Sequence, residues 1–409
     1  MKSILIKNIG QLILGHTHAV KDSALANLPT VSDAFLLIED GRIKDFGNNE
    51  IAPENADEIF DAKGGFVFPS FVDSHTHLVF AASREQEFVD RINGLSYEEI
   101  SARGGGILNS ARKLQAADED SLFENAMKRL EEVIQFGTGA IEIKSGYGLT
   151  LESELKMLRV IRRIKESSNI PVKATFLGAH SIPMEFRGDR KVYVDKVVDE
   201  MLPQVVFEGL ADYIDVFCEK VAFTVEETER IMEAGQKMGL PAKIHTNQFF
   251  SLGGIEASVK YGARSVDHLE VVNDDEIKAL QNSKTIATLL PSAPFFLNQG
   301  HFPPARKLID AGITVALASD YNPGTTPSGK MPFVLSLACI NMRMLPNEAF
   351  NAATINGAAA IDLEEDYGSI TRGKVANLFL TGPLSSTDFL PYAFGSNLIE
   401  KVMVKGVWH

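Results

Sequence analysis

The chain has 409 residues, 45% hydrophobic and 23% charged, a composition typical of a globular protein with one large and one small domain, or with two of ordinary size. No apolar run approaches the ~20 residues that span a membrane, and the N-terminal stretch lacks the features of a signal peptide. The net charge of −14 disfavours nucleic acid and anionic membranes as partners, and the two cysteines, far apart in sequence, disfavour a disulfide scaffold. We therefore expect a cytoplasmic protein that binds a small molecule.

The two ends of the chain share one character. Residues 1–62 contain short β-like runs with a turn at Asp40-Gly41, and residues 365–409 contain runs of the same kind. We expect these two segments to form a composite β-sandwich domain. Residues 63–364 would then form the catalytic domain between them.

Eight strand-like runs follow one another in this central part, and most end in a polar or glycine-rich tip: SFVDSHTH, GAIEIKSGYG, VKATFLGAH, YIDVFCE, PAKIHTNQ, RSVDHLE, TIATLLP and TVALASDYNPG. Helix-like segments separate them. This alternation predicts an α/β protein with a closed parallel (β/α)8 barrel of the TIM type. An open doubly wound sheet is disfavoured, because it usually has fewer strands and a glycine-rich phosphate turn after the first.

Three segments between the strands carry clear helix signals. Residues 121–137 open with a capping-box pattern at Ser121 and close on a glycine. Residues 151–165 place leucine and isoleucine at helical spacing on one face. Residues 224–239 again begin with a capping box and end on a glycine, so all three are expected to be helical.

The first barrel strand ends in a pair of histidines, His75 and His77. Residues two apart on a strand share one face, so both imidazoles point the same way. Their burial costs free energy unless something pairs with them, and a zinc or iron ion would do so. Taken alone, the motif is explained equally well by two histidines that are hydrogen-bonded in a core or a turn.

Further polar residues follow other predicted strands, namely His180, His245, His268 and Asp320. A parallel barrel brings the carboxyl ends of its strands to one rim, where barrel enzymes build their active sites. This convergence favours a metal site over separate structural histidines. The pair His75 and His77, with His245 and Asp320, would supply three nitrogens and one oxygen and leave a position for water. His180 and His268 would lie behind these ligands or face the substrate.

The H-x-H pair, the histidines that end strands five and six, and the aspartate that ends strand eight resemble the amidohydrolase superfamily. Longer stretches resemble one branch of it: VDSHTHLVFAASREQEF, ARGGGI, EIKSGYGL, TFLGAHSIP, KIHTNQF, SVDHLE and ALASDYNPGT, within about residues 66–330. That branch hydrolyses the cyclic amide of 4-imidazolone-5-propanoate to N-formimidoyl-L-glutamate in histidine degradation. The resemblance implies this activity, with one divalent or trivalent zinc or iron ion per subunit.

The resemblance also implies roles for individual residues. The metal ligands would be His75, His77, His245 and Asp320. The catalytic residues would be His268, Asp320 and Gln248. The substrate would be contacted by Arg84, Tyr97, Tyr147, His180, Gln248, Asn322, Gly324 and Thr325. We further expect the chain to form a homodimer.

Gln248 departs from the family pattern. Some relatives carry a glutamate at this position that shuttles protons to the ring, whereas an amide cannot transfer a proton. Either Gln248 only hydrogen-bonds the substrate, or proton transfer falls to Asp320 and His268. The departure weakens one alternative, a deaminase acting on a related heterocycle. A catalytically silent binding protein is the other alternative, but it would be expected to lack a ligand, and none is missing.

Arg84 would anchor the propanoate tail, because a chain of this net charge needs a local cation to hold an anion. The alternative is a surface arginine paired with Glu85 or Glu87.

Lys144 could be carbamylated to bridge two metals, as in some relatives. A solvated or salt-bridged lysine fits better, so we expect a single metal. The glycines at 104–106 could hinge a lid formed by residues 93–107, or merely connect two elements.

Overall fold

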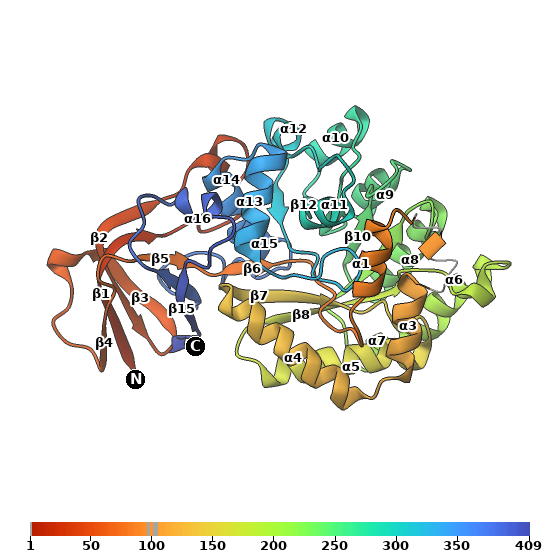
Figure 1. Ribbon diagram of the computed structural model, residues 1–409, viewed down its shortest axis with the longest axis horizontal. Coiled ribbons are helices and arrows are strands. Elements are labelled where there is room, and N and C mark those ends of the chain that lie inside the picture. The colour runs from red at the N-terminus through yellow and green to blue at the C-terminus, as the bar shows by residue number, and fades with distance from the viewer. Residues whose placement is uncertain (1, 96–98, 101–104) are drawn as a thin grey trace.

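The computed structural model describes residues 2–95, 99, 100 and 105–409. It consists of an eight-stranded sheet built from the two ends of the chain and a barrel of eight parallel strands surrounded by helices (Figure 1). Both termini lie beside the sheet. Within the described part of the chain, no helix has the length and apolar character needed to cross a membrane.

All eight expected barrel strands are present, and they pair in chain order. They are β6 (Phe71–Asp73), β7 (Thr138–Lys144), β8 (Val172–Ala179), β9 (Tyr213–Cys218), β10 (Ala242–Thr246), β11 (Ser265–His268), β12 (Ile286–Leu289) and β13 (Val315–Leu317). The first and last strands meet just beyond their ends. There the His77 N–H donates to the Tyr321 carbonyl at 2.9 Å and the Asp320 N–H to the His75 carbonyl at 3.1 Å. These bonds close the ring, which confirms the predicted (β/α)8 barrel.

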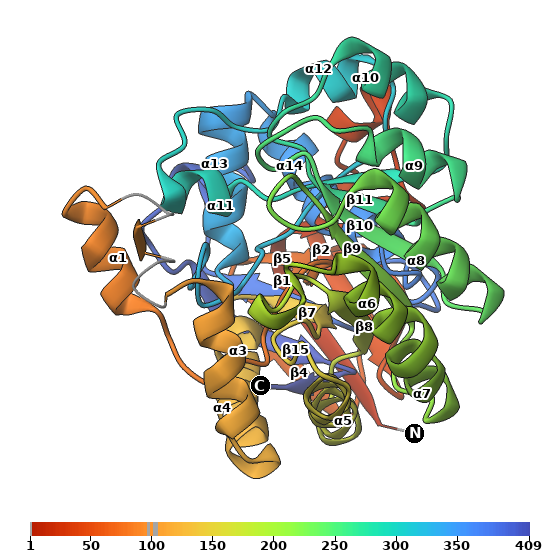
Figure 2. The ribbon, with the colours of Figure 1, turned by 90° about the vertical axis from the view of Figure 1, so that its right-hand side faces the viewer.

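Helices surround the barrel, as Figure 2 shows for α4, α5, α8 and α9. The helices of the barrel domain are α1 (Glu85–Ile92), α3 (Ile107–Ala116), α4 (Glu119–Gln135), α5 (Leu151–Ser167), α6 (Arg190–Asp195), α7 (Leu202–Phe207), α8 (Val225–Lys237), α9 (Gly254–Lys260), α10 (Asp274–Gln281), α11 (Ser292–Leu297), α12 (Ala305–Asp310), α13 (Met331–Met342), α14 (Pro346–Ala353) and α15 (Ile355–Ala359). A further helix, α16 (Phe389–Tyr392), lies in the C-terminal segment.

The three predicted helices are present, with one correction. The N-cap of α4 is Asp118, whose carboxylate accepts a hydrogen bond from the Ser121 N–H at 2.8 Å, so Ser121 lies inside the helix and does not cap it. An ionised carboxylate is the stronger acceptor at the positive end of the helix dipole. The capping box of α8 is formed as predicted, by Thr224 and Glu227.

The terminal segments form a single curled sheet. Its strands are β1 (Ser3–Ile13), β2 (Thr30–Glu39), β3 (Arg42–Asn48), β4 (Glu58–Asp61), β5 (Phe66–Pro69), β14 (Leu378–Thr381), β15 (Ile399–Val404) and β16 (Val407–Trp408). The Ile43 N–H donates to the Lys374 carbonyl at 2.9 Å, which draws the β3 edge towards the segment before β14. The sheet includes β5, which lies beyond the boundary expected at residue 62.

One end of the barrel is closed. Helix α15 packs across the amino ends of the strands, and a Cβ added to Gly357 would collide with the Val72 carbonyl. Small apolar residues on both sides, including Ala140, Ala316 and Ala358, allow this approach. The opposite end, where the carboxyl ends of the strands lie, is therefore the end available for chemistry.

Candidate metal centre

Four residues from three parts of the barrel converge at its carboxyl rim. The Nε2 atoms of His77 and His245 are 3.2 Å apart. The Oδ1 of Asp320 lies 3.6 Å from the Nε2 of His75 and 3.8 Å from the Nε2 of His77. All four side chains are buried. Strand alternation brings the H-x-H pair to one face, and barrel closure brings Asp320 against it.

Two carboxylates set the orientation of two of these rings. The Nδ1 of His75 lies 2.7 Å from the Oδ2 of Asp267, and the Nδ1 of His245 lies 2.9 Å from the Oδ2 of Asp215. An ionised carboxylate only accepts hydrogen bonds, so each Nδ1 carries the proton. The Nε2 of each ring is then a free lone pair directed into the cluster, the arrangement typical of histidine ligands with a carboxylate behind them.

The cluster fits a cation. The Nε2 of His75, which faces the cluster, is buried and has no hydrogen-bond partner within the described part of the chain. Burial holds the pKa of His75, His77 and His245 well below its usual value, so the rings are neutral. Ligands about 2.1 Å from one ion lie roughly 3.4 Å apart in tetrahedral geometry, close to the separations found here.

The donor atoms can be grouped in two ways. His75, His77 and Asp320 have donor atoms close enough together to hold a metal, and so do His75, His245 and His268. Six of the predicted residues therefore meet at one rim, because His180 also stacks on His77 with ring centroids 5.1 Å apart.

Lys144 is salt-bridged. The sequence favoured a solvated or salt-bridged lysine over a carbamylated one, and the structure shows that this lysine is not solvated. Its ammonium is fully buried and lies 2.7 Å from Glu142 and 2.8 Å from Asp215. A second buried lysine, Lys243, lies 2.9 Å from Glu142. These side chains, with Asp267, form an ionic network inside the barrel that supports the carboxylates behind His75 and His245.

Sequence reasoning missed this network, although a signal for it was present. The barrel strands carry polar or charged residues at every second position, in E-I-K of β7, K-I-H of β10 and S-V-D of β11. Such spacing places Glu142 with Lys144, and Lys243 with His245, on one face of a buried strand. Charges on a face without solvent must pair with each other, so this pattern predicts a polar barrel interior.

The loop after β13 holds Asp320 in place. Asp320 has a left-handed backbone, with φ at +57°. The Oγ1 of Thr325 donates to its Oδ2 at 3.1 Å, and the Asn322 side chain accepts from the Gly324 and Thr325 N–H groups, each at 2.8 Å. Burial raises the pKa of Asp320 to about 6, although the charge on His268 opposes the shift.

His268 is the exception among the buried histidines. Burial acts to lower its pKa, but the charge of Glu270 and their hydrogen bond raise the pKa to about 9. The two groups are 3.3 Å apart, from Nδ1 to Oε1. Sequence reasoning did not single out Glu270, although it stands two residues after the histidine in SVDHLE.

Arg84 reaches the loop that follows Asp320. Its guanidinium is about nine-tenths buried, with 11% of the side chain exposed, and it pairs with Glu87, Nε to Oε2, at 2.8 Å. The alternative to a substrate anchor was a surface arginine paired with Glu85 or Glu87. The pairing with Glu87 agrees with that alternative, but Arg84 does not lie on the surface. A Cβ on Gly324 would meet the guanidinium, so Arg84 packs directly on this glycine. Arg91 donates to the Gly324 carbonyl at 3.3 Å from the same side.

The remaining predicted substrate residues lie partly at the rim. Tyr147 is buried, with its ring 5.8 Å from that of His77. Gln248 is buried just beyond β10, and its amide has no hydrogen-bond partner among the described residues. Tyr97 and Gly104 fall outside the described residues, and so does part of the loop expected as a lid.

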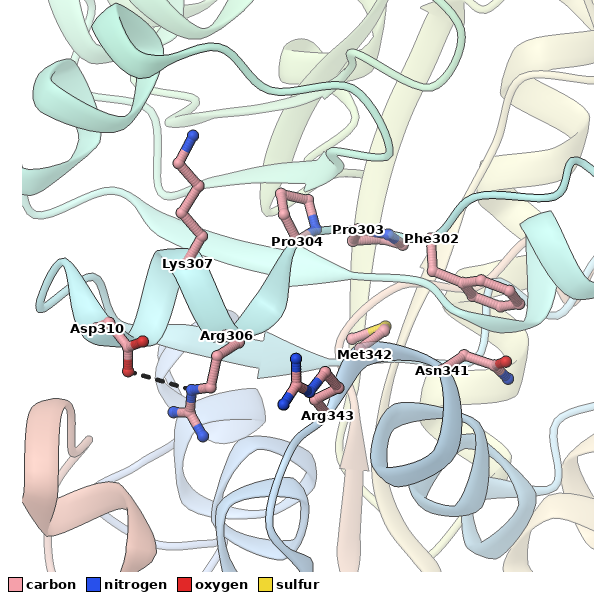
Figure 3. Close-up of a pocket in the computed structure, with 9 residues that line it drawn as sticks. All are labelled: Phe302, Pro303, Pro304, Arg306, Lys307, Asp310, Asn341, Met342 and Arg343. Carbon is pink, nitrogen blue, oxygen red and sulfur yellow. Dashed lines mark hydrogen bonds and ion pairs between the residues drawn. The ribbon is translucent and has the colours of Figure 1, made fainter.

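A separate surface hollow of about 430 Å3 lies between α12 and α13 (Figure 3). Arg306, on its wall, already pairs with Asp310 at 3.1 Å and with Glu348 at 3.0 Å. The charge of Arg306 is therefore compensated, and the rim remains the candidate site.

Sequence comparison places the chain among known hydrolases. Residues 66–409 match the amidohydrolase family. The chain is 55% identical to the imidazolonepropionase of Flavobacterium johnsoniae over 98% of both chains. It is 53% identical to the imidazolonepropionase of Christiangramia forsetii over 99% of both, and 39% identical to that of Alkaliphilus metalliredigens over 99% of this chain and 97% of the other.

Solved structures share the fold at low sequence identity. A triazine hydrolase variant superimposes with a TM-score of 0.75 at 17% identity, covering 99% of this chain and 94% of the other. The guanine deaminase of E. coli gives a TM-score of 0.74 at 16% identity, covering 100% of this chain and 99% of the other.

Proposed function

The chain belongs to the amidohydrolase family, and on this premise we propose that it hydrolyses the cyclic amide of 4-imidazolone-5-propanoate to N-formimidoyl-L-glutamate. Identity of 52–55% to imidazolonepropionases over nearly the whole chain supports this substrate. The observation that carries the chemistry is the convergence of buried imidazole lone pairs and one carboxylate at the barrel rim.

His75, His77, His245 and Asp320 would hold one zinc or iron ion. When bound, such an ion polarises a carbonyl group and lowers the pKa of a water molecule towards neutrality. Asp215 and Asp267 keep the Nε2 atoms of His245 and His75 unprotonated and ready to bind it. The buried side chains around the site exclude bulk water.

Asp320 and His268 would carry the protons. As a water molecule attacks the ring carbonyl carbon, Asp320 accepts its proton at a carboxylate oxygen. His268 donates from Nε2 to the carbonyl oxygen while negative charge develops there. Asp320 then passes the proton to the departing ring nitrogen, the C–N bond breaks, and the carbonyl carbon becomes the new carboxylate. Gln248 would hydrogen-bond the substrate and take no part in proton transfer.

Substrate recognition would rest on the residues around the rim. Arg84 would hold the propanoate carboxylate, and its Nη1 edge is not engaged by Glu87. The other contacts would come from Tyr97, Tyr147, His180, Asn322, Gly324 and Thr325. Because the Arg84 guanidinium packs on Gly324, the anchor and the Asp320 loop form one surface.

The test is an assay of purified protein loaded separately with zinc and with iron(II). Loss of the imidazolone chromophore with formation of N-formimidoyl-glutamate by mass spectrometry is the expected result, and metal analysis of untreated protein identifies the native ion. Release of ammonia from an amino-substituted heterocycle without ring opening would favour the deaminase. Metal-loaded protein that binds these compounds without turning them over would favour a binding protein.

The reaction would take place in the cytoplasm, since both cysteines are free thiols in the structure. Cell fractionation tests this location. Light scattering of the purified protein tests the homodimer expected from the sequence.

A further inference from the structure

Glu270 is a buried carboxylate with an unusual environment. It lies two residues after His268, and its side chain is fully buried. Its Oε1 is 3.3 Å from the Nδ1 of His268, and its Oε2 has no hydrogen-bond partner among the described residues. The separation is long for a charged hydrogen bond, but catalytic hydrogen bonds commonly tighten when substrate binds.

Other buried carboxylates of the barrel have a structural function that Glu270 lacks. Glu142 pairs with Lys144 at 2.7 Å. Glu154 accepts from the Gly148 N–H at 2.7 Å, and Glu219 accepts from the Phe249 N–H at 2.7 Å. In the described part of the chain, Glu270 has neither a lysine nor a backbone N–H, and His268 is its hydrogen-bond partner. Burying a charge in this way costs stability, so a reason other than folding must account for it.

The backbone is bent to bring the two side chains together. His268 and Leu269 both have left-handed backbones, with φ at +91° and +66°, which non-glycine residues rarely adopt. The Val271 N–H donates to the Asn247 carbonyl at 3.0 Å and so fixes the turn against the segment after β10. Strain of this kind is typical of sites where geometry serves function.

We propose that Glu270 is a positioning residue for His268, an inference that rests on the proposed function. It accepts the hydrogen bond from Nδ1–H and thereby fixes the ring tautomer and orientation. The other ring nitrogen, Nε2, is then presented to the reacting carbonyl oxygen. The negative charge of Glu270 stabilises the positive ring while Nε2 holds its proton, and Glu270 itself exchanges no proton.

The first test compares Glu270→Gln and Glu270→Leu with the wild type. Both should lower kcat by roughly a hundredfold, as expected for losing one donor to a developing oxyanion, while KM stays within about twofold. Bound metal should be unchanged by elemental analysis. Glu348→Gln is the matched control, because it alters a buried, ion-paired glutamate remote from the rim and should leave kcat unchanged. A rise in KM with unchanged kcat in Glu270→Gln would overturn the proposal.

A double-mutant cycle tests whether Glu270 acts through His268. His268→Gln should lower kcat by about a hundredfold or more, and adding Glu270→Gln should cause no further loss. Losses that multiply would show that Glu270 acts independently, which contradicts the proposal.

Nitrogen-15 NMR of histidine-labelled, zinc-loaded protein gives a readout that does not depend on turnover. The Nδ1–H of His268 should give a downfield proton signal that disappears in Glu270→Gln and persists in Glu348→Gln. If the wild type does not open the imidazolone, the proposed function fails, and this signal still decides the pairing. Its absence from the wild type would overturn the inference.

Discussion

The interiors of the two parts of the molecule are built from opposite residue types. The terminal sheet encloses apolar side chains, among them Ile6, Leu36 and Leu378. Inside the barrel, Lys144, Lys243 and their carboxylate partners are equally buried but charged. An apolar interior gains stability from burial, whereas buried charges roughly offset their desolvation only when every partner is present. The sheet interior therefore serves stability, and the barrel interior fixes the orientation of the site.

Removal of a proposed metal ligand should produce the largest effect and distinguish the two interiors most clearly. His75→Ala should lower kcat by at least about a thousandfold, or about 4 kcal/mol, because the metal is lost. The terminal sheet should be unaffected, so the far-UV circular dichroism should match that of the wild type. Metal analysis and steady-state kinetics check this, and full turnover with bound metal would contradict the ligand assignment.

Breaking the ionic network should affect both stability and the site. Lys144→Met leaves Glu142 and Asp215 without their shared cation and should lower the free energy of unfolding by about 3–5 kcal/mol. Metal affinity should fall as well, since Asp215 supports His245. Lys260→Met, which removes an exposed pair with Glu229, is the control and should cost less than about 1 kcal/mol in denaturant titrations. Equal losses of unfolding free energy in Lys144→Met and Lys260→Met would contradict the difference expected between the buried network and an exposed ion pair.

A cavity in the terminal sheet should act on stability alone. Leu36→Ala should lower the free energy of unfolding by about 3 kcal/mol, while kcat/KM per folded molecule stays at the wild-type value. Urea titration and kinetics at a temperature where the variant is folded measure the two quantities. Loss of activity without unfolding would mean that the sheet interior also shapes the site.

A change outside both interiors should alter recognition and little else. Arg84→Met should reduce kcat/KM for the anionic substrate. The reduction should correspond to a loss of about 2–3 kcal/mol of transition-state stabilisation, with metal content retained. An analogue without the carboxylate should be a poor substrate for the wild type and should lose little further in the variant. Unchanged turnover of the anionic substrate would place the carboxylate anchor elsewhere.

The smallest effect is expected at Gln248, which has no hydrogen-bond partner among the described residues. Gln248→Ala should raise KM roughly fivefold, which corresponds to about 1 kcal/mol of binding free energy. It should leave kcat and thermal stability nearly unchanged. A large fall in kcat with KM constant would show that this amide takes part in the chemical step.

The sequence by itself determined the barrel and the identity of the rim residues. Alternating apolar runs and capped helices specify strand and helix locally, and a parallel barrel necessarily gathers its strand ends at one rim. For this reason His75, His77, His245 and Asp320 could be named as neighbours before their distances were known. The H-x-H spacing also predicted the shared face correctly, because strand alternation is a local property.

The tertiary structure alone decided which charges pair and in which direction the rings face. Asp215 lies 71 residues from its partner Lys144 along the chain, and Glu142 pairs with Lys243 on another strand of the barrel. The environment of Lys144, the cap of α4 and the pairing of Glu270 with His268 depend on barrel register, on competing donors and on a strained turn. Local spacing indicates which side chains share a buried face, but the partner that each charge finds across the barrel depends on residues distant in sequence.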